Sequence, residues 1–105
     1  MIFHVIWSEF ATKQLDVIYE YYEKKASSTI AKKLIKGIIN APKKLLLTPE
    51  IGQEESLLKQ RSVHYRYLVF KNYKIIYSID NEKGFIKIAD VFDTRQNPLK
   101  IKRNS

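Results

Sequence analysis

Five residues that can meet an anion lie in the second half of the chain, at Arg61, His64, Arg66, Lys74 and Arg95. Cationic side chains of this kind stabilise negative charge on phosphate or carboxylate oxygens. Arginine stays protonated at physiological pH, so it can bind an anion but is a poor proton shuttle. His64 supplies an imidazole near the others, and we interpret it first as a surface histidine at the start of a strand.

The basic character of the chain comes almost entirely from this half. The 105 residues include 19 Lys and Arg against 11 Asp and Glu, a net charge of +8. Residues 1–58 hold eight Lys against seven acids, whereas residues 59–105 hold seven Lys and four Arg against four acids. Clustered charge speeds encounter with the opposite sign, which favours a polyanionic or acidic partner. A basic surface that serves only solubility would give the same count.

Several classes of site are disfavoured by composition. Cysteine is absent and the two histidines, His4 and His64, are far apart in sequence, so we expect no metal and no cofactor. Apolar runs are far shorter than the ~20 residues of a membrane-spanning helix. The N-terminus lacks the basic region of a secretory signal, so we expect a cytoplasmic protein that does not engage membranes.

Helical periodicity follows a short strand at the N-terminus. Residues 2–7 are β-branched and aromatic and predict the strand. Ser8 is placed to cap a helix that runs to about residue 25. A second helix begins after Ser27 or Ser28 and keeps its apolar spacing to residue 47. Pro42 lies inside that pattern and removes a main-chain donor, so we expect the second helix to be kinked or broken there.

A loop over residues 48–55 separates the helices from three segments rich in Tyr, Val, Ile and Phe. These segments predict strands at residues 65–70, 73–79 and 85–92. Lys71 and Asn72 can form a tight turn, in which asparagine tolerates positive φ. Together the elements predict one α+β domain over residues 1–105, ordered β-α-α-β-β-β. A two-helix hairpin should pack on one face of a four-stranded, mainly antiparallel sheet.

Strand alternation orients Arg66 away from its neighbours. It points to the face opposite Tyr65 and Tyr67. There it binds an anion, or it extends into solvent from a sheet edge or pairs with Asp90 or Asp93. The sequence leaves both interpretations open.

Lys74 and Arg95 occupy different settings. Lys74 shares a strand face with Ile76 and Ser78, which fits a recessed anion site, although an ordinary exposed lysine has equal weight. Arg95 follows the last strand within a densely polar segment. That segment is either a functional site or a turn in which Asp93 binds local amides.

These features occur in an order that resembles the RelE/ParE superfamily of toxins from type II toxin–antitoxin modules. The matching segments are Trp7-Ser8, Ile18, Tyr21-Tyr22, Leu45, Pro49, Gly52, Tyr65-Arg66-Tyr67, Asn72 to Tyr77, and Val91-Phe92 running through Asp93 to Pro98. The resemblance covers nearly the whole chain. It implies that Arg66, Lys74 and Arg95 share an anion-facing surface, with Lys74 where the superfamily more often has arginine. It also implies an antitoxin partner, in a hetero-oligomer with the toxin.

The superfamily has two branches with different targets. The RelE-like branch cleaves mRNA in the ribosomal A site, and the candidate catalytic residues here would be Arg66, Lys74 and Arg95. Two departures disfavour that branch: Leu68 stands where a second basic residue is usual, and no tyrosine follows Tyr77. The resemblance therefore favours the ParE-like branch, which inhibits DNA gyrase. The ribonuclease and a non-toxic relative that only binds antitoxin remain the alternatives.

Overall fold

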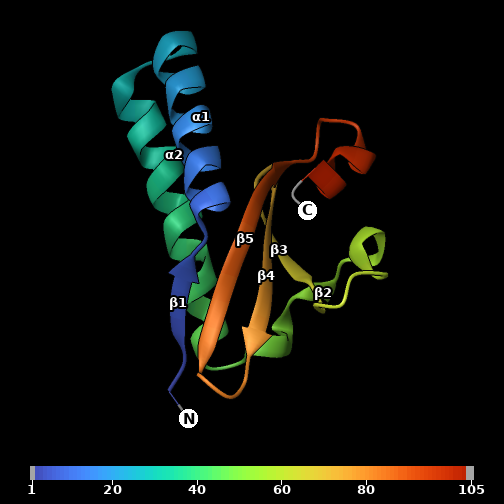
Figure 1. Ribbon diagram of the computed structural model, residues 1–105. Helices are drawn as coiled ribbons and strands as arrows, with labels where there is room; N and C mark the ends of the chain where they lie inside the picture. The colour runs from blue at the N-terminus through green and yellow to red at the C-terminus, as the bar shows by residue number, and fades with distance from the viewer. Residues whose placement is uncertain (1, 104–105) are drawn as a thin grey trace.

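The computed structural model describes residues 2–103, in which two helices lie side by side on one face of a twisted sheet (Figure 1). The elements are β1 (His4–Trp7), α1 (Glu9–Lys25), α2 (Ser28–Asn40), β2 (Gln53–Glu54), β3 (Arg66–Phe70), β4 (Tyr73–Asp80) and β5 (Phe85–Asp93), with short 3-10 helices η1 (Ala41–Leu46), η2 (Pro49–Ile51), η3 (Ser56–Leu58) and η4 (Pro98–Arg103). None of the helices in the described chain has the length and apolar character needed to cross a membrane.

The sheet has five strands in the order β1-β5-β4-β3-β2. β1 runs parallel to β5 at one edge, and the other pairs are antiparallel. The predicted α+β class and helix hairpin are confirmed, but the predicted count of four strands is one too low. Gln53 and Glu54, placed in a loop by the sequence, pair with Tyr67 and Arg66 as β2.

Local capping fixes both helices where the sequence predicted. The hydroxyl of Ser8 accepts a hydrogen bond from the amide of Ala11 at 3.0 Å, and that of Ser27 accepts one from the amide of Ile30 at 3.1 Å. α2 stops at Asn40, and Pro42 lies in the 3-10 helix that follows. The expected break is confirmed, because proline cannot donate to the preceding turn.

The tight turn between β3 and β4 differs from the prediction in its residue of positive φ. Lys71, with φ of 53°, takes the left-handed conformation that was expected of Asn72. Asn72 is used instead to tie the hairpin to the end of β5. Its side-chain amide donates to Asp93 at 3.1 Å, and its carbonyl accepts from the amide and hydroxyl of Thr94, each at 2.8 Å.

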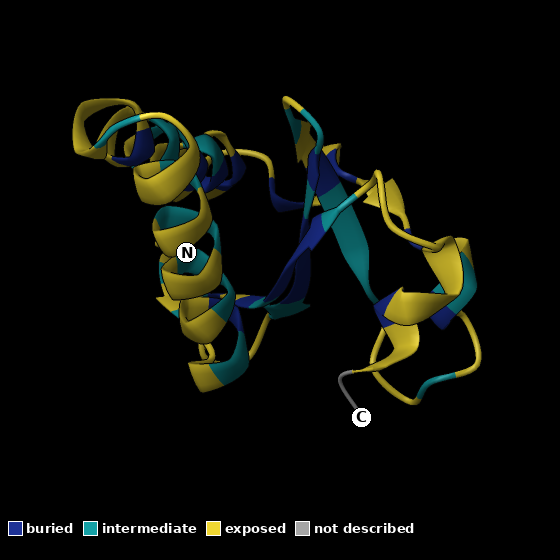
Figure 2. Cartoon of the chain, turned by 90° about the horizontal axis from the view of Figure 1, so that it is seen from above, coloured by how far each residue is buried: buried dark blue, intermediate teal, exposed yellow. Residues whose placement is uncertain are grey.

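The sheet is covered on both faces, by different kinds of structure (Figure 2). The helices enclose the larger apolar core, which includes Ile38, Ile75 and Ile88. On the opposite face η3 and η4 close a second, smaller cluster of Leu58, Ile76, Phe92 and Ile101, which we call the outer cluster.

A register shift lets β5 serve both cores. Ile76 pairs with Asp90 but Tyr77 pairs with Ile88, so Ala89 is an extra residue on β5. Such a bulge reverses the alternation of the strand. As a result Val91 joins the helix-side core, while Asp90 turns to the outer face.

Candidate functional site

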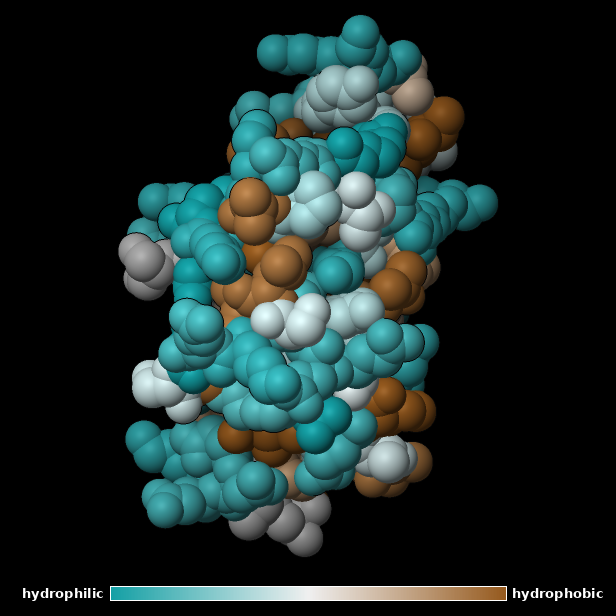
Figure 3. Space-filling view, turned by 90° about the vertical axis from the view of Figure 1, so that its right-hand side faces the viewer, coloured by the Kyte–Doolittle hydropathy of each residue, from teal (hydrophilic) through white to brown (hydrophobic). Residues whose placement is uncertain are grey.

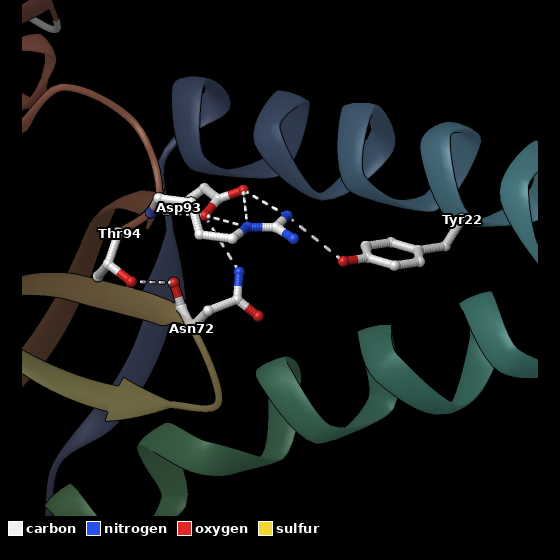
Figure 4. A network of polar contacts seen from close by, with 5 residues as sticks. Tyr22, Asn72, Asp93 and Thr94 are labelled. Carbon is white, nitrogen blue, oxygen red and sulfur yellow. Dashed lines mark hydrogen bonds and ion pairs between the residues drawn. The ribbon is translucent and has the colours of Figure 1, made fainter.

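Arg95 lies two residues beyond β5 and its guanidinium reaches Tyr22 of α1. Figure 4 shows the polar network around it, with Tyr22 on the helix and Asn72, Asp93 and Thr94 at the strand ends. The guanidinium of Arg95 donates to Asp93 from Nε at 3.0 Å and from Nη2 at 2.8 Å, and Nη2 also approaches the Tyr22 hydroxyl at 3.5 Å. The hydrogen bond from Arg95 is the main cause of the lowered pKa of Asp93. Asp93 in turn raises the pKa of Arg95, so the pair is fully ionised at neutral pH.

A groove of about 320 Å³ opens beside this network, between α1 and the ends of β4 and β5. Its apolar wall includes Val17, Tyr21 and Tyr22, and the ion pair of Arg95 and Asp93 also lines it. Val17 and Tyr21 are large apolar side chains of α1 that remain exposed to solvent, at 61% and 49%. We call this surface the α1 groove. An apolar wall beside an exposed arginine suits an amphipathic segment whose carboxylate shares the guanidinium with Asp93.

Lys74 belongs to the outer face and already has a carboxylate partner. Its Nζ lies 2.7 Å from Oε1 of Glu55 and 4.2 Å from the centre of the Tyr67 ring. Glu55 is only 2% exposed, and its other oxygen accepts from the amide of Leu57 at 3.2 Å. The recess predicted for an external anion is therefore filled by a side chain of the protein itself.

Arg66 holds a loop rather than an acidic residue. It donates to the carbonyls of Glu50 at 3.3 Å and Gly52 at 3.0 Å, and Asp90 and Asp93, named as alternative partners, pair with Arg103 and Arg95 instead. The orientation opposite Tyr67 is confirmed, since Tyr67 packs against the outer cluster and Leu68, next to it, lies in the helix-side core.

Tyr77 of β4 also holds the loop that contains η2 and Gly52. Its buried hydroxyl donates to the carbonyl of Pro49 at 2.6 Å and accepts from the amide of Gly52 at 3.0 Å. A Cβ on Gly52 would lie 2.3 Å from that hydroxyl oxygen, so only glycine fits this close approach. Burial is the main cause of the raised pKa of Tyr77. Tyr77 and Arg66 together make the η2 loop a fixed part of the sheet edge.

The remaining candidates lie beside η3 and η4. Arg61 donates from Nη2 to the carbonyl of Lys102 at 2.9 Å, and Nε2 of His64 lies 3.7 Å from Glu54. The five predicted residues are thus distributed over separate surroundings. Strand alternation places Arg66 and Lys74 on opposite faces of the sheet. The single anion-facing surface implied by the superfamily is not assembled from Arg66, Lys74 and Arg95 in this conformation.

Sequence reasoning missed an ion pair between Arg103, whose side chain is 27% exposed, and the buried Asp90. Two parallel hydrogen bonds of 2.9 and 3.0 Å join them, and the guanidinium also lies over the rings of Phe10 and Phe92. Asp90 is 2% exposed, and burial is the main cause of its raised pKa. Its position within the apolar run of β5 was the available signal, because a buried carboxylate needs a cationic partner.

The described residues contain no cluster of three His, Asp or Glu side chains that could hold a metal ion. No curated protein sequence matches the chain. A solved structure titled "Chromosomal ParDE TA system from P. aeruginosa" matches with a TM-score of 0.71 at 18% identity, covering 88% of this chain and 96% of that chain. The family model for the ParE toxin of the type II toxin–antitoxin system parDE matches residues 5–98. This chain therefore belongs to the ParE toxin family.

Proposed function

We propose that this protein arrests bacterial growth by inhibiting DNA gyrase, as the toxin of a type II toxin–antitoxin pair in the cytoplasm. The observation that carries the proposal is the match to the ParE toxin family over residues 5–98. The dispersal of the cationic side chains supports it, because a gyrase inhibitor needs a binding surface and no assembled catalytic group. The antitoxin partner follows from the same family membership.

The rival function is cleavage of ribosome-bound mRNA. That reaction needs a base, an acid for the leaving 5′-oxygen and cations around the phosphate. Arg66 is bound to loop carbonyls, Lys74 to Glu55, and Arg95 to Asp93. A ribonuclease would have to break these contacts before the three cations could act together. The geometry therefore supports the gyrase proposal over the ribonuclease.

The two targets are separated by what fails first in cells. We expect induction of the protein alone to cause DNA breaks and an SOS response while translation continues at its initial rate. Pulse labelling of protein synthesis, together with an SOS reporter, measures both in one culture. Early translation arrest with cuts in A-site mRNA would contradict the gyrase proposal. Normal growth of cells that contain the folded protein would favour a non-toxic relative.

We further propose that the α1 groove receives an acidic, amphipathic segment of the antitoxin. Arg95 and the exposed Val17, which both line the groove, offer the complementary charge and apolar surface. A short reading frame next to this gene that encodes an acidic protein would identify the candidate partner.

Two valines of equal exposure test the groove. Val17, in the groove, is 61% exposed and Val69, on β3, is 59% exposed. We expect Val17→Asp to weaken binding of the purified antitoxin by more than tenfold and Val69→Asp to leave it nearly unchanged, measured by calorimetry. Equal effects of the two substitutions would place the antitoxin elsewhere.

A further inference from the structure

A hollow of about 410 Å³ lies between η3 and η4 on the outer face, lined by residues that include Ser56, Lys59, Arg61 and Lys102. We call it the η3–η4 notch. Its two walls are joined through the outer cluster, where Leu58 of η3 and Ile101 of η4 are both buried. The hydrogen bond from Arg61 to the carbonyl of Lys102, 2.9 Å long, links the rims. The notch therefore has fixed walls although its elements are short.

The notch is strongly basic. Residues 56–64 and 94–103, which supply η3, η4 and their flanks, contain no Asp or Glu. The acids that flank these segments, and the buried Asp90, are already paired. Glu55 binds Lys74, Asp93 binds Arg95, Asp90 binds Arg103, and Glu54 lies beside His64. Lys59 and Lys102 are exposed, and the face that carries η3 and η4 is largely hydrophilic around a smaller apolar area (Figure 3).

The ion pair of Asp90 and Arg103 holds η4 and its exposed lysines in place. Arg103 is the last described residue of η4, and its two hydrogen bonds to buried Asp90 hold η4 against the sheet. The neighbouring Lys100 and Lys102 stay exposed. One basic residue of η4 is thus used as an anchor, and the lysines beside it remain available to a partner.

We propose that the η3–η4 notch binds the phosphate backbone of double-stranded DNA. Exposed lysines on a rigid rim suit backbone phosphates, which require positive charge and no base-specific contact. Single-stranded nucleic acids are usually held by aromatic stacking, and the notch is lined by no aromatic side chain among the described residues. A protein partner would be anchored by exposed apolar groups, whereas of the two leucines that line the notch Leu58 is buried and Leu57 is half-buried against the outer cluster. The inference is independent of gyrase as the target.

The test is fluorescence anisotropy with a labelled DNA duplex about two helical turns long, titrated with the purified chain between about 50 and 200 mM salt. The notch variant is Lys59→Gln with Lys102→Gln. The matched control is Lys32→Gln with Lys36→Gln on α2, which removes the same charge from exposed positions of the helix layer. Both variants keep every main-chain contact, and urea unfolding verifies that each is folded.

We expect the notch variant to bind at least tenfold more weakly at the lowest salt. The negative slope of log K against log salt should become shallower by about two, since two phosphate contacts are lost and each contributes roughly 0.9. The control should keep the wild-type slope. Equal losses in both variants, no binding of wild type at about 50 mM salt, or tighter binding of single-stranded RNA or polyglutamate than of duplex would each overturn the proposal.

Discussion

The two faces of the sheet are stabilised by different interactions. On the helix side, apolar side chains spaced at helical and strand periods form a continuous core around Ile38 and Ile75. On the outer side, a cluster of four buried apolar residues is flanked by two ion pairs whose carboxylates, Glu55 and Asp90, are each 2% exposed. The helix-side core contains only apolar and tyrosine side chains among its buried residues. The outer layer depends on cations whose removal would leave a buried charge.

This difference also divides the proposed functions. The α1 groove lies on the helix side, where apolar wall and exposed valine suit a partner segment. The η3–η4 notch lies on the outer side, where the lysines are held in place by ion pairs beneath them. A substitution in the α1 groove should therefore weaken antitoxin binding and leave DNA binding unchanged. A substitution in the η3–η4 notch should do the reverse.

The largest effect on stability is expected from Arg103→Ala, which leaves the buried carboxylate of Asp90 without its cationic partner. Removing one partner of a buried pair costs about 3 to 5 kcal/mol. Urea unfolding measures the loss, and adding Asp90→Asn to the variant should restore part of it. A loss no greater than that of an exposed pair such as Lys87–Asp80 would show that the outer layer does not depend on the buried pair.

The same pair predicts a pH dependence of defined sign. Burial raises the pKa of Asp90 in the folded state, so the folded protein holds this proton more tightly than the unfolded chain. The contribution of Asp90 to stability therefore falls as pH rises from the ordinary aspartate pKa, about 3.9, through the raised folded value. Without Arg103 this decline should become steeper. A flat profile for Arg103→Ala over that range would contradict the assignment.

Tyr77→Phe is expected to cost about 1 to 3 kcal/mol, because it leaves the carbonyl of Pro49 and the amide of Gly52 without their buried partner. The η2 loop should then exchange its amide hydrogens faster than the rest of the sheet. The control is Tyr19→Phe, whose hydroxyl makes an exposed hydrogen bond to Glu23. Equal costs for the two variants would contradict a structural role for Tyr77.

Lys74→Met should cost about 1 to 2 kcal/mol, less than Arg103→Ala, because Lys74 donates one hydrogen bond to Glu55 whereas Arg103 donates two to Asp90. The matched surface variant is Lys87→Met, whose pair with Asp80 spans 3.8 Å and is more exposed. Thermal unfolding of both compares them directly. If Lys74→Met were as stable as wild type, the buried carboxylate of Glu55 would not need a cationic partner.

Arg95→Ala is expected to change stability least, because an exposed ion pair is screened by water. The lowered pKa of Asp93 means that its contribution is present above the ordinary aspartate pKa and is lost as pH falls through the folded value. Wild type and variant should therefore converge in acid. A large loss of stability at neutral pH would make Arg95 a structural residue rather than part of the α1 groove.

The helix-side layer was predicted well from the sequence because regular apolar spacing and local capping signals specify its helices. The stripe of Ala11, Leu15 and Ile18, the caps at Ser8 and Ser27, and the break at Pro42 are all local signals. β2 was missed because Gln53 and Glu54 are two polar residues with no alternation to detect.

The site was predicted by residue type but not by partner. Arg66, Lys74 and Arg95 stood out as cations, yet the contacts of Arg66 and Lys74 join chain segments that only the fold brings together, whereas Arg95 pairs locally with Asp93. Glu55 lies 19 residues before Lys74 and was assigned to a loop. Arg103 lies beyond the last strand, where no periodicity indicates that it turns back to Asp90. Long-range ion pairs of this kind leave no local pattern.

Incubation of the purified protein with DNA gyrase, ATP and supercoiled plasmid tests the central claim most directly. We predict that linear plasmid accumulates after the enzyme is denatured, in proportion to the protein added, while ribosome-bound mRNA in a parallel reaction stays intact. Unchanged plasmid together with cleaved mRNA would contradict gyrase as the target and identify the ribonuclease instead.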